Sequence, residues 1–458
     1  MSQLPALKGQ PDRREDDPIA IIPIQRDASQ LPRAVAPAAR ATVAIVGMGY
    51  VGLPTALSLL DAGMPVIGLD VSPVRLAAIR AGSVDLLPDD LARLHRQLAG
   101  DDFTLTTDAA RLPEADTVIV CVPTPVTTNL APDLAPLAAA CETVVAAARP
   151  GQTIVLTSTT YVGCTRDLLE QPLRQRGLEP GVDVHVVFSP ERIDPGVADH
   201  NPAATPRIVG GLTPQSTESA VAVLQRTCPS LHIVSSPEAA EMAKLMENTF
   251  RAVNIAFANE MADIAFELGL SAREVVEAAA TKPYGFMKFM PGPGVGGHCI
   301  PVDPHYLLWQ LRGRRMAAPV IDAAMTGIAL RPKRVVARLV ELLAANGRPL
   351  RGARVHVAGV AYKPGVADAR ESPALEIIEA CRTAGADVTF TDVMVDEIRL
   401  ADGTRLASTP LTEVAPSLVD AVLVHTAHPG EDHGWLLEHP VVLDTTYRLD
   451  SVPHRAVL

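Results

Sequence analysis

The 458-residue chain lacks the marks of a membrane or secreted protein. No apolar run is long enough to cross a bilayer, and the first residues, "MSQLPALKGQPDRREDD", have no apolar core of a signal peptide. Its six cysteines stand apart, and no pair has the CxxC spacing of a metal or redox site. We therefore expect a cytoplasmic protein that has no metal site and no disulfides.

Basic residues are also in short supply. The chain has 40 lysines and arginines against 52 aspartates and glutamates, which gives a net charge of −12. This balance disfavours nucleic acid or an anionic membrane as the main partner, although a local basic pocket can still bind phosphates. Apolar residues make up 48% of the chain, so two or three domains can each bury a core.

Residues 1–40 mix Pro, Arg, Asp and Ala without periodicity, and we expect a mobile tail there. The pattern then changes. An apolar run from Val43 to Val46 enters a glycine turn, a helical segment follows from about Pro54 to Ala62, and a second apolar run covers Pro65 to Leu69. Similar runs recur in "TVIVCVPTP", "TIVLTSTT" and "VHVVFSPER". Strands that alternate with helices predict a doubly wound parallel sheet over residues 41–236.

The stretch from Pro237 to Gly269 predicts one long helix, since it has apolar residues at helical spacing and no internal Gly or Pro. Its apolar residues cover more than one face, which is typical of a buried helix and predicts a homodimer packed around it. The residues concerned are Met242, Leu245, Phe250, Val253, Phe257, Met261 and Phe266. Strand and helix patterns alternate again towards the carboxyl terminus. The predicted fold is therefore α/β, with two doubly wound parallel-sheet domains joined by a helical segment.

The sequence Gly47-x-Gly49-x-x-Gly52 follows a predicted strand and opens a helix. In that context glycines let backbone N–H groups approach a pyrophosphate at the helix N-terminus, as in a Rossmann domain. Asp70, at the end of the next strand, would accept hydrogen bonds from the adenosine ribose and select NAD over NADP. Arg75 can reach the same adenosine end, but it could equally be a solvated helix charge or hold a 2′-phosphate. A flavodoxin-like turn that binds nothing is the alternative.

The loop "GPGVGGHCIPVDP", residues 292–304, holds Cys299 in a setting without apolar periodicity, whereas the other five cysteines lie in apolar or helical runs. Glycines let a substrate approach closely, and the N–H groups of a following helix would favour the thiolate. His298 is an unfavoured partner because adjacent side chains rarely face each other. A thiol beside NAD indicates aldehyde-level oxidation, in which the thiol adds to an aldehyde, hydride leaves to NAD and water cleaves the thioester.

Seven motifs, in this order, resemble the UDP-glucose/GDP-mannose dehydrogenase family from about residue 41 to 458. They are "VGMGYVGLPTA", "VCVPTP", "LTSTT", "FSPERIDPG", "EMAKLMENTFRAVNIAFANE", "GPGVGGHCIPVDP" and "GVAYKPGVADARESP". The resemblance implies oxidation of the 6-hydroxyl of a nucleotide sugar to a carboxylate, with two NAD per turnover and no metal. It also implies an NAD-binding Rossmann domain at 41–236, a helical dimerisation domain at 237–330 and a Rossmann-like domain that binds the nucleotide sugar at 331–458.

The resemblance also implies roles for single residues. Cys299 would form the thiohemiacetal and the thioester, and Asp303 would orient a catalytic water. Glu191 would be the base for thioester hydrolysis, unless it is an N-capping residue, and Thr159 would hold the water or the cofactor.

Lys244 would stabilise the developing oxyanion, and Asn248 shares its helix face at i+4. With Glu191 and Lys363, these two residues would meet the sugar nucleotide. Arg370, from the far domain, would close over the phosphates of the cofactor. The expected NAD-binding set is Gly47, Gly49, Tyr50, Val51, Gly52, Asp70, Arg75, Thr124, Thr159 and Arg370.

Two features resemble the family branch that acts on UDP-N-acetylhexosamines. Pro195 stands where UDP-glucose oxidisers of the family carry a carboxylate, and the run before Cys299 reads "TKPYGFMKFMPGPGVGGHC". The run favours UDP-N-acetylglucosamine over UDP-N-acetylmannosamine, with UDP-glucose as a further alternative. Another NAD enzyme, such as a hydroxyacid dehydrogenase, would not need the thiol or the second α/β domain. A non-catalytic sugar-nucleotide-binding homologue would have no reason to retain the whole catalytic set.

Overall fold

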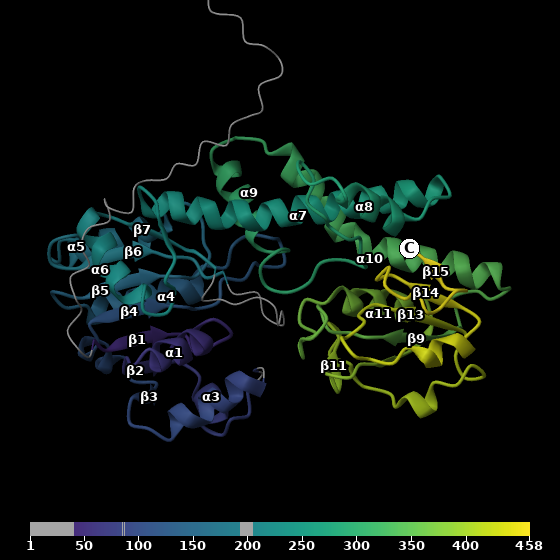
Figure 1. The fold of residues 1–458 in the computed structure, drawn as a ribbon, viewed down its shortest axis with the longest axis horizontal. Coiled ribbons are helices and arrows are strands. Elements are labelled where there is room, and N and C mark those ends of the chain that lie inside the picture. Colours follow the sequence, from purple (N-terminus) through teal and green to yellow (C-terminus); the bar gives the residue numbers. More distant parts are fainter. Residues whose placement is uncertain (1–40, 85, 87, 193–204) are drawn as a thin grey trace, which may run out of the picture.

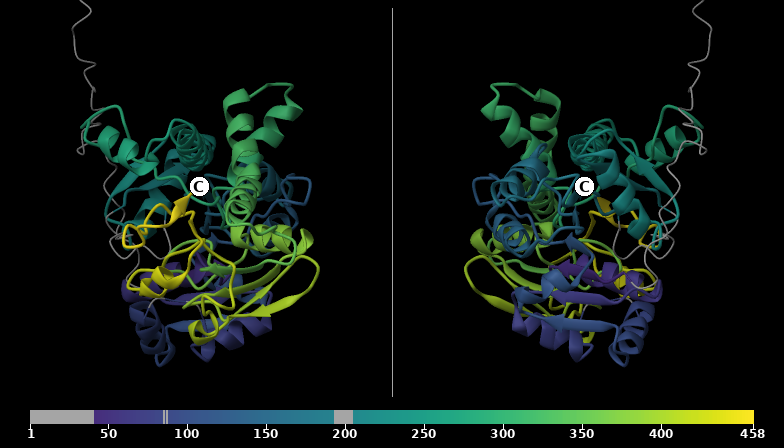
Figure 2. Two further views of the ribbon diagram at one scale, coloured as in Figure 1. Left: turned by 90° about the vertical axis from the view of Figure 1, so that its right-hand side faces the viewer. Right: turned by 90° about the vertical axis from the view of Figure 1, so that its left-hand side faces the viewer.

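The computed structural model describes residues 41–84, 86, 88–192 and 205–458, and the tail expected at 1–40 lies outside them. Figure 1 shows two α/β domains joined by long helices that run along the molecule. In the end-on views of Figure 2 the helices of the central segment lie in the upper part of the picture, and the two sheet domains lie below them. The fold class expected from the sequence is confirmed.

The first domain is built on an eight-stranded sheet with the order β3-β2-β1-β4-β5-β6-β7-β8. Its strands are β1 (Val43–Val46), β2 (Val66–Leu69), β3 (Phe103–Thr106), β4 (Thr117–Val120), β5 (Thr153–Leu156), β6 (His185–Phe188), β7 (Arg207–Gly211) and β8 (Leu231–Ile233). Strands β6 and β7 are antiparallel, and the other neighbours are parallel. The order of the first six is that of a dinucleotide-binding sheet.

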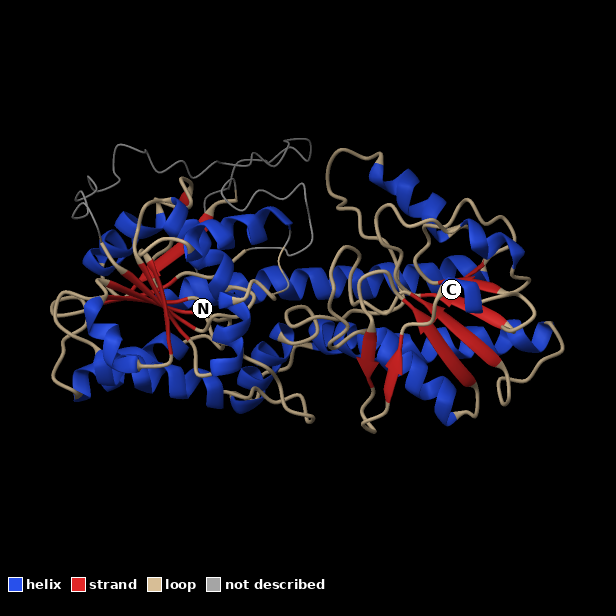
Figure 3. Cartoon of the chain, turned by 90° about the horizontal axis from the view of Figure 1, so that it is seen from below, coloured by secondary structure: helices blue, strands red, loops and turns tan. Residues whose placement is uncertain are grey.

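Helices cover both faces of this sheet, as Figure 3 shows, so β1, β2, β4 and β5 are buried along their whole length. This explains why these strands read as continuous apolar runs instead of alternating patterns. The helices are α1 (Gly52–Asp61), α2 (Pro73–Arg80), α3 (Pro88–Leu98), α4 (Ala135–Ala147), α5 (Gln171–Gln175) and α6 (Pro214–Leu224).

Helix α7 (Pro237–Glu267) is the long helix expected from the sequence. The Ser236 hydroxyl caps it by accepting the N–H of Ala239, a proline occupies its first position, and Gly269 follows its end at φ +69°. The other central helices are α8 (Ala272–Ala280), α9 (Asp303–Gly313) and α10 (Pro319–Ala345). Helix α10 is continuous through residue 330, where a domain boundary was expected. Within the described residues, no helix has the length and apolarity needed to cross a bilayer.

The second domain has a parallel sheet with the order β10-β9-β13-β14-β15. Its elements are β9 (Arg354–Ala358), α11 (Pro373–Thr383), β10 (Asp387–Thr391), β13 (Ala421–Val424), β14 (Val442–Asp444) and β15 (Ala456–Val457), with a hairpin of β11 (Glu397–Arg399) and β12 (Arg405–Ala407). Val335, Leu339 and Leu343 of α10 belong to its buried core, together with Ala262 and Ala265 of α7. The central helices are therefore part of this domain's packing.

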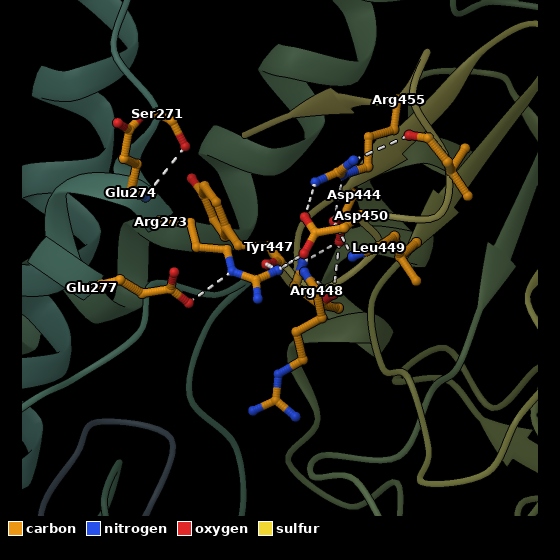
Figure 4. A network of polar contacts seen from close by, with 12 residues as sticks. Ser271, Arg273, Glu274, Glu277, Asp444, Tyr447, Arg448, Leu449, Asp450 and Arg455 are labelled. Carbon is orange, nitrogen blue, oxygen red and sulfur yellow. Dashed lines mark hydrogen bonds and ion pairs between the residues drawn. The ribbon is translucent and has the colours of Figure 1, made fainter.

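A polar network ties α8 to the loop after β14 (Figure 4). Arg273 donates a hydrogen bond to Asp450 and reaches the carbonyl of Tyr447 at 3.5 Å. Asp450 also accepts from Arg455 at 2.7 Å, and Arg455 lies 3.2 Å from the buried Asp444. Tyr447 has φ +58°, a strained conformation for a residue with a side chain, which this network and its buried ring hold in place.

Candidate active site

Cys299 lies in the loop immediately before α9, and its side chain is exposed. Its carbonyl accepts the N–H groups of Val302 and Asp303, at 3.1 and 2.8 Å, so the turn that carries Cys299 leads into the helix. The structure explains why glycines precede Cys299, which was not predicted from the sequence. A Cβ at Gly296 would lie 2.5 Å from the carbonyl oxygen of Glu371, and one at Gly297 would lie 2.9 Å from the ring of Tyr362. These glycines let the second domain pack directly against the cysteine loop.

Asp303, the first residue of α9, is only 2% exposed. Asn248 of α7 donates a side-chain hydrogen bond to its carboxylate. Burial raises the pKa of Asp303 to about 6, because it outweighs the opposing effects of the Lys244 charge and the Asn248 hydrogen bond. This carboxyl group therefore exchanges its proton close to neutral pH.

Glu191 is held by three contacts. Its carbonyl accepts a hydrogen bond from the Lys244 ammonium at 3.1 Å. One carboxylate oxygen accepts the N–H of Arg192 at 2.8 Å, and the other lies 3.2 Å from a guanidinium nitrogen of Arg207. Lys244 and Asn248, predicted to share a face of α7, both line the cavity between the two domains.

Two cavities meet at Lys244, His298 and Cys299. One, of about 470 Å³, lies on the side of the first sheet, and the other, of about 500 Å³, lies between the two domains. The first is lined by seven expected site residues, namely Val51, Thr124, Thr159, Glu191, Lys244, Cys299 and Asp303. The second is lined by Lys244, Asn248, Cys299 and Lys363. A group held between the cavities would lie beside the thiol and the ammonium.

Sequence reasoning missed several residues of the interdomain cavity. Tyr362, His425, Thr426 and Arg448 line it from the second domain. They follow strands β9, β13 and β14, and the carboxyl ends of parallel strands are where α/β sheets place their ligands. Polar residues directly after the apolar runs "VHVAG", "AVLV" and "VVLD" were the available signal.

The glycine turn after β1 fits a dinucleotide. A Cβ at Gly47, which has φ +95°, would lie 2.7 Å from the carbonyl oxygen of Cys121, and one at Gly52 would lie 1.8 Å from the carbonyl oxygen of Gly47. Around Gly49 there is open space within 4 Å. The outer two glycines thus permit close packing, and the middle one leaves room for a phosphate at the N-terminus of α1.

Asp70 and Arg75 are both bound to that turn. The Asp70 carboxylate accepts the N–H groups of Met48 and Ser72, at 2.8 and 2.9 Å. Arg75 donates from Nε to the carbonyl of Met48 at 2.8 Å, so it is not a solvated helix charge. Neither residue lines the two cavities, and both lie with the glycine turn at the carboxyl ends of β1 and β2.

Arg370 of the second domain reaches the glycine turn of the first. Its guanidinium carbon lies 5.0 Å from the centre of the Tyr50 ring, and it pairs with Asp368 at 2.8 Å. The pairing with Asp368 raises the pKa of Arg370. Burial lowers the pKa of His298, and the Arg370 charge lowers it further. A cation of the second domain thus lies over the turn expected to hold the cofactor.

Models of one protein family match all parts of this architecture. The NAD binding domain of the UDP-glucose/GDP-mannose dehydrogenase family matches residues 41–228, its central domain 238–327 and its UDP binding domain 356–451. A UDP-N-acetyl-D-mannosamine dehydrogenase of Pyrococcus horikoshii is 32% identical over 88% of this chain and 94% of its own length. An NDP-N-acetyl-D-galactosaminuronic acid dehydrogenase of Ralstonia nicotianae is 35% identical over 74% of this chain and 79% of its own.

A solved structure has the same fold. The structure of the UDP-D-ManNAc dehydrogenase from Pyrococcus horikoshii superposes with a TM-score of 0.80 at 30% identity, covering 89% of this chain and 95% of that one.

Proposed function

Since the chain belongs to the UDP-glucose/GDP-mannose dehydrogenase family, we propose that it oxidises the 6-hydroxyl of a UDP-N-acetylhexosamine to a carboxylate. Members of this family are NAD-dependent nucleotide-sugar dehydrogenases, and the NAD-binding and UDP-binding domains are both present. The observation that carries the proposal is the junction of the two cavities. Cys299 and Lys244 line both the cavity beside the first sheet and the cavity that reaches the UDP-binding domain.

The residues at that junction support the chemistry. The Cys299 thiolate adds to the aldehyde formed from the 6-hydroxyl, and the Lys244 ammonium stabilises the oxyanion of the thiohemiacetal. NAD, when bound, would accept one hydride in each of the two oxidation steps, and the hydroxyl proton lost in each step would pass to water. Thr124 and Thr159 line the same cavity and can position the reacting groups there.

Release of the acid requires water to attack the thioester. Asp303, held by Asn248, accepts a hydrogen bond from that water and orients it, and Glu191 takes up its proton. Both carboxylates line the cavity that contains Cys299. Loss of water's proton and departure of the thiolate complete the cycle.

The interdomain cavity supports a nucleoside diphosphate. Its lining carries four cations besides Lys244, from both domains, against the carboxylate of Glu247. These cations are Arg192, Arg251, Lys363 and Arg448. In a protein with a net charge of −12, this concentration of cations favours a dianionic group such as the diphosphate of a UDP sugar.

The choice of sugar rests on sequence alone. The run that precedes Cys299 favours UDP-N-acetylglucosamine, whereas the relatives are named for N-acetylmannosamine and N-acetylgalactosaminuronic acid. Pro195, the other residue of that argument, lies outside the described residues. A few polar groups decide between such epimers. The proposed substrate is therefore a UDP-N-acetylhexosamine, and UDP-N-acetylglucosamine is the favoured one.

We further propose a homodimer and the three functional units 41–236, 237–330 and 331–458. Helix α7 carries large apolar side chains that its own chain leaves exposed, including Met246 at 65% and Phe257 at 57%. Such a face on a long helix is best covered by a second copy. Sedimentation at micromolar concentration should give twice the mass of the chain, and a monomer would exclude this arrangement.

Turnover with a panel of sugar nucleotides tests the function. The purified protein is mixed with NAD and either UDP or GDP sugars, and NADH is followed by absorbance. Two NADH for each UDP-N-acetylhexosamine consumed, with a uronic acid as product, is the expected result. One NADH per sugar, or turnover only with GDP sugars, would contradict the proposal.

A further inference from the structure

One strand of the first sheet runs against its neighbour and thereby delivers a cation to the active site. Strands β6 and β7 are antiparallel, with Phe188 paired to Gly210. The first residue of β7, Arg207, therefore lies at the edge where β6 and the parallel strands end. That edge carries the residues that line the cavity of Cys299, and a parallel β7 would have placed Arg207 at the opposite edge.

The Arg207 side chain is buried and held by neutral groups of the two residues that directly follow β5 and β6. Its Nε donates to the Ser189 hydroxyl at 2.9 Å, and one Nη lies 3.4 Å from both the Ser189 carbonyl and the Thr157 hydroxyl. The Ser189 hydroxyl is itself fixed, because it donates to the carbonyl of Ile208 at 2.7 Å. These contacts leave the other Nη pointing at Glu191, 3.2 Å from its carboxylate.

A buried guanidinium needs a carboxylate partner, and a planar guanidinium fixes the position of that partner more closely than an ammonium does. We propose that Arg207 is a positioning residue that aims the Glu191 carboxylate at the thioester on Cys299. The inference rests on the proposed function, in which Glu191 is the base for hydrolysis. Arg207 does not line either cavity, so it acts through Glu191 and does not touch the substrate.

The step that depends on this position is the last one. Water adds to the thioester carbon while Glu191 accepts its proton, the C–S bond breaks, and Cys299 leaves as the thiolate. Both hydride transfers precede this step, and the proposed function gives Glu191 no part in either of them. A displaced Glu191 should therefore slow hydrolysis while leaving the oxidation steps in place. A residue that only held the strands together would affect all steps alike.

The test uses rapid mixing of the full chain with NAD and the sugar nucleotide that the panel identifies. Arg207→Gln removes the positive charge, and Arg207→Lys keeps the charge but replaces the planar guanidinium with an ammonium group. In the Gln variant we expect a burst of NADH at close to the wild-type rate, then a steady state slower by about 10- to 100-fold. This is less than the roughly 100- to 10,000-fold contribution of a positioned base, because Glu191 is displaced and not removed. Intact mass should show the enzyme accumulating as the covalent sugar adduct. The Lys variant should fall between wild type and Gln.

Arg149→Gln is the matched control. Arg149 belongs to the same domain, and its guanidinium binds the carbonyls of Pro113 and Ala115, away from both cavities. Its burst and steady state should equal those of the wild type. The number of NADH formed per sugar by the wild type tests the proposed function independently of the variants, and two is the expected value.

The ratio of burst to steady state tests Arg207. Equal slowing of burst and steady state, or turnover without accumulated adduct, would overturn the role of Arg207 while leaving the proposed function intact. If the Gln variant does not fold, the Lys variant is used to test the role of Arg207. When Arg207→Lys is added to Glu191→Gln, we expect the steady-state rate to fall by less than about a further twofold, because the effects of two partners in one network are not additive. A full additional loss would overturn the inference.

Discussion

Asn248, in the middle of α7, donates its side-chain hydrogen bond to Asp303, the first residue of α9. This contact joins the helix that carries Lys244 to the helix that directly follows Cys299. The ammonium and the thiol therefore keep a fixed relation to each other although 55 residues separate the two bonded partners. A second link, from Gln310 of α9 to the carbonyl of Val162 at 2.6 Å, holds the segment after Thr159 to the same helix.

The pH dependence of turnover should report on Asp303. Its pKa is raised to about 6, and the ionised carboxylate accepts a hydrogen bond from water more strongly than the protonated carboxyl group does. We expect kcat to fall as the pH drops through about 6. Asp303→Asn should lower kcat by about 100-fold and remove this limb. If kcat of the Asn variant still fell as the pH drops through about 6, a group other than Asp303 would be responsible.

The same substitution should stabilise the fold at alkaline pH. Because the pKa of Asp303 is higher in the folded protein, the folded state binds the proton more tightly, and stability falls as the pH rises from about 4 to about 6. Above that range the ionised, buried carboxylate is a net cost. Asp303→Asn should therefore raise the free energy of unfolding at pH 8 by on the order of 2 kcal/mol. Urea denaturation at pH 8 and pH 5 measures this, and an equal loss at both pH values would contradict it.

Asp392 anchors the loop that carries Lys363. It accepts the N–H groups of Val360 and Ala361, at 2.7 and 3.0 Å, and lies 3.2 Å from a ring nitrogen of His428. Burial alone would raise its pKa, but the His428 hydrogen bond and the backbone N–H groups lower it to about 2. The other ring nitrogen of His428 accepts the N–H of Gly365, at 3.1 Å, beyond Lys363 on the same loop.

Asp392→Asn should therefore loosen the Lys363 loop without touching the thiol. We expect KM for the UDP sugar to rise by about tenfold, the equivalent of one lost charge-assisted hydrogen bond, while kcat changes by less than about twofold. Asp402→Asn is the control, because Asp402 is exposed and its hydrogen bonds are local, to the N–H of Thr404 at 2.7 Å and to the Thr404 side chain. A fall in kcat with KM unchanged would show that the loop does not serve substrate binding.

Cofactor choice should depend on Asp70. Its carboxylate, oriented by the N–H groups of Met48 and Ser72, would face a 2′-phosphate with like charge. We expect kcat/KM for NAD to exceed that for NADP by about 100-fold, and Asp70→Asn to reduce this preference by about tenfold. Steady-state kinetics with both cofactors measures it. Equal use of NAD and NADP by the unaltered protein would remove the role given to Asp70.

Local signals predicted the elements of the fold well. Helix α7 was predictable from its periodicity, its Ser-Pro start and its terminal glycine, and β1 and β4 from apolar runs that end in turns. The exposed position of Cys299 was predictable because it stands in a loop with no apolar pattern. These features depend on residues close together in the sequence.

Contacts made by topology were not predictable in this way. Arg207 meets Glu191 only because β7 is reversed, and no local pattern announces the direction of a strand. The packing of Gly296 against Glu371, 75 positions later in the chain's numbering, likewise depends on how the second domain closes. Helix α10 continues through Pro332, where a proline would normally end a helix, so its length was not predictable from local signals.

The thiol of Cys299 is the centre of the account, and one substitution tests it most directly. Cys299→Ser keeps the volume but replaces the thiolate with a hydroxyl that stays protonated at neutral pH. Cys381→Ala is the control, since burial in the second core raises the pKa of that thiol to about 11 and removes it from chemistry. The measurement is the NADH yield per enzyme together with the intact mass. We predict that the Ser variant stalls after at most one round, with or without a trapped sugar ester, while the control turns over normally. Normal steady-state formation of the uronic acid by the Ser variant would contradict the account.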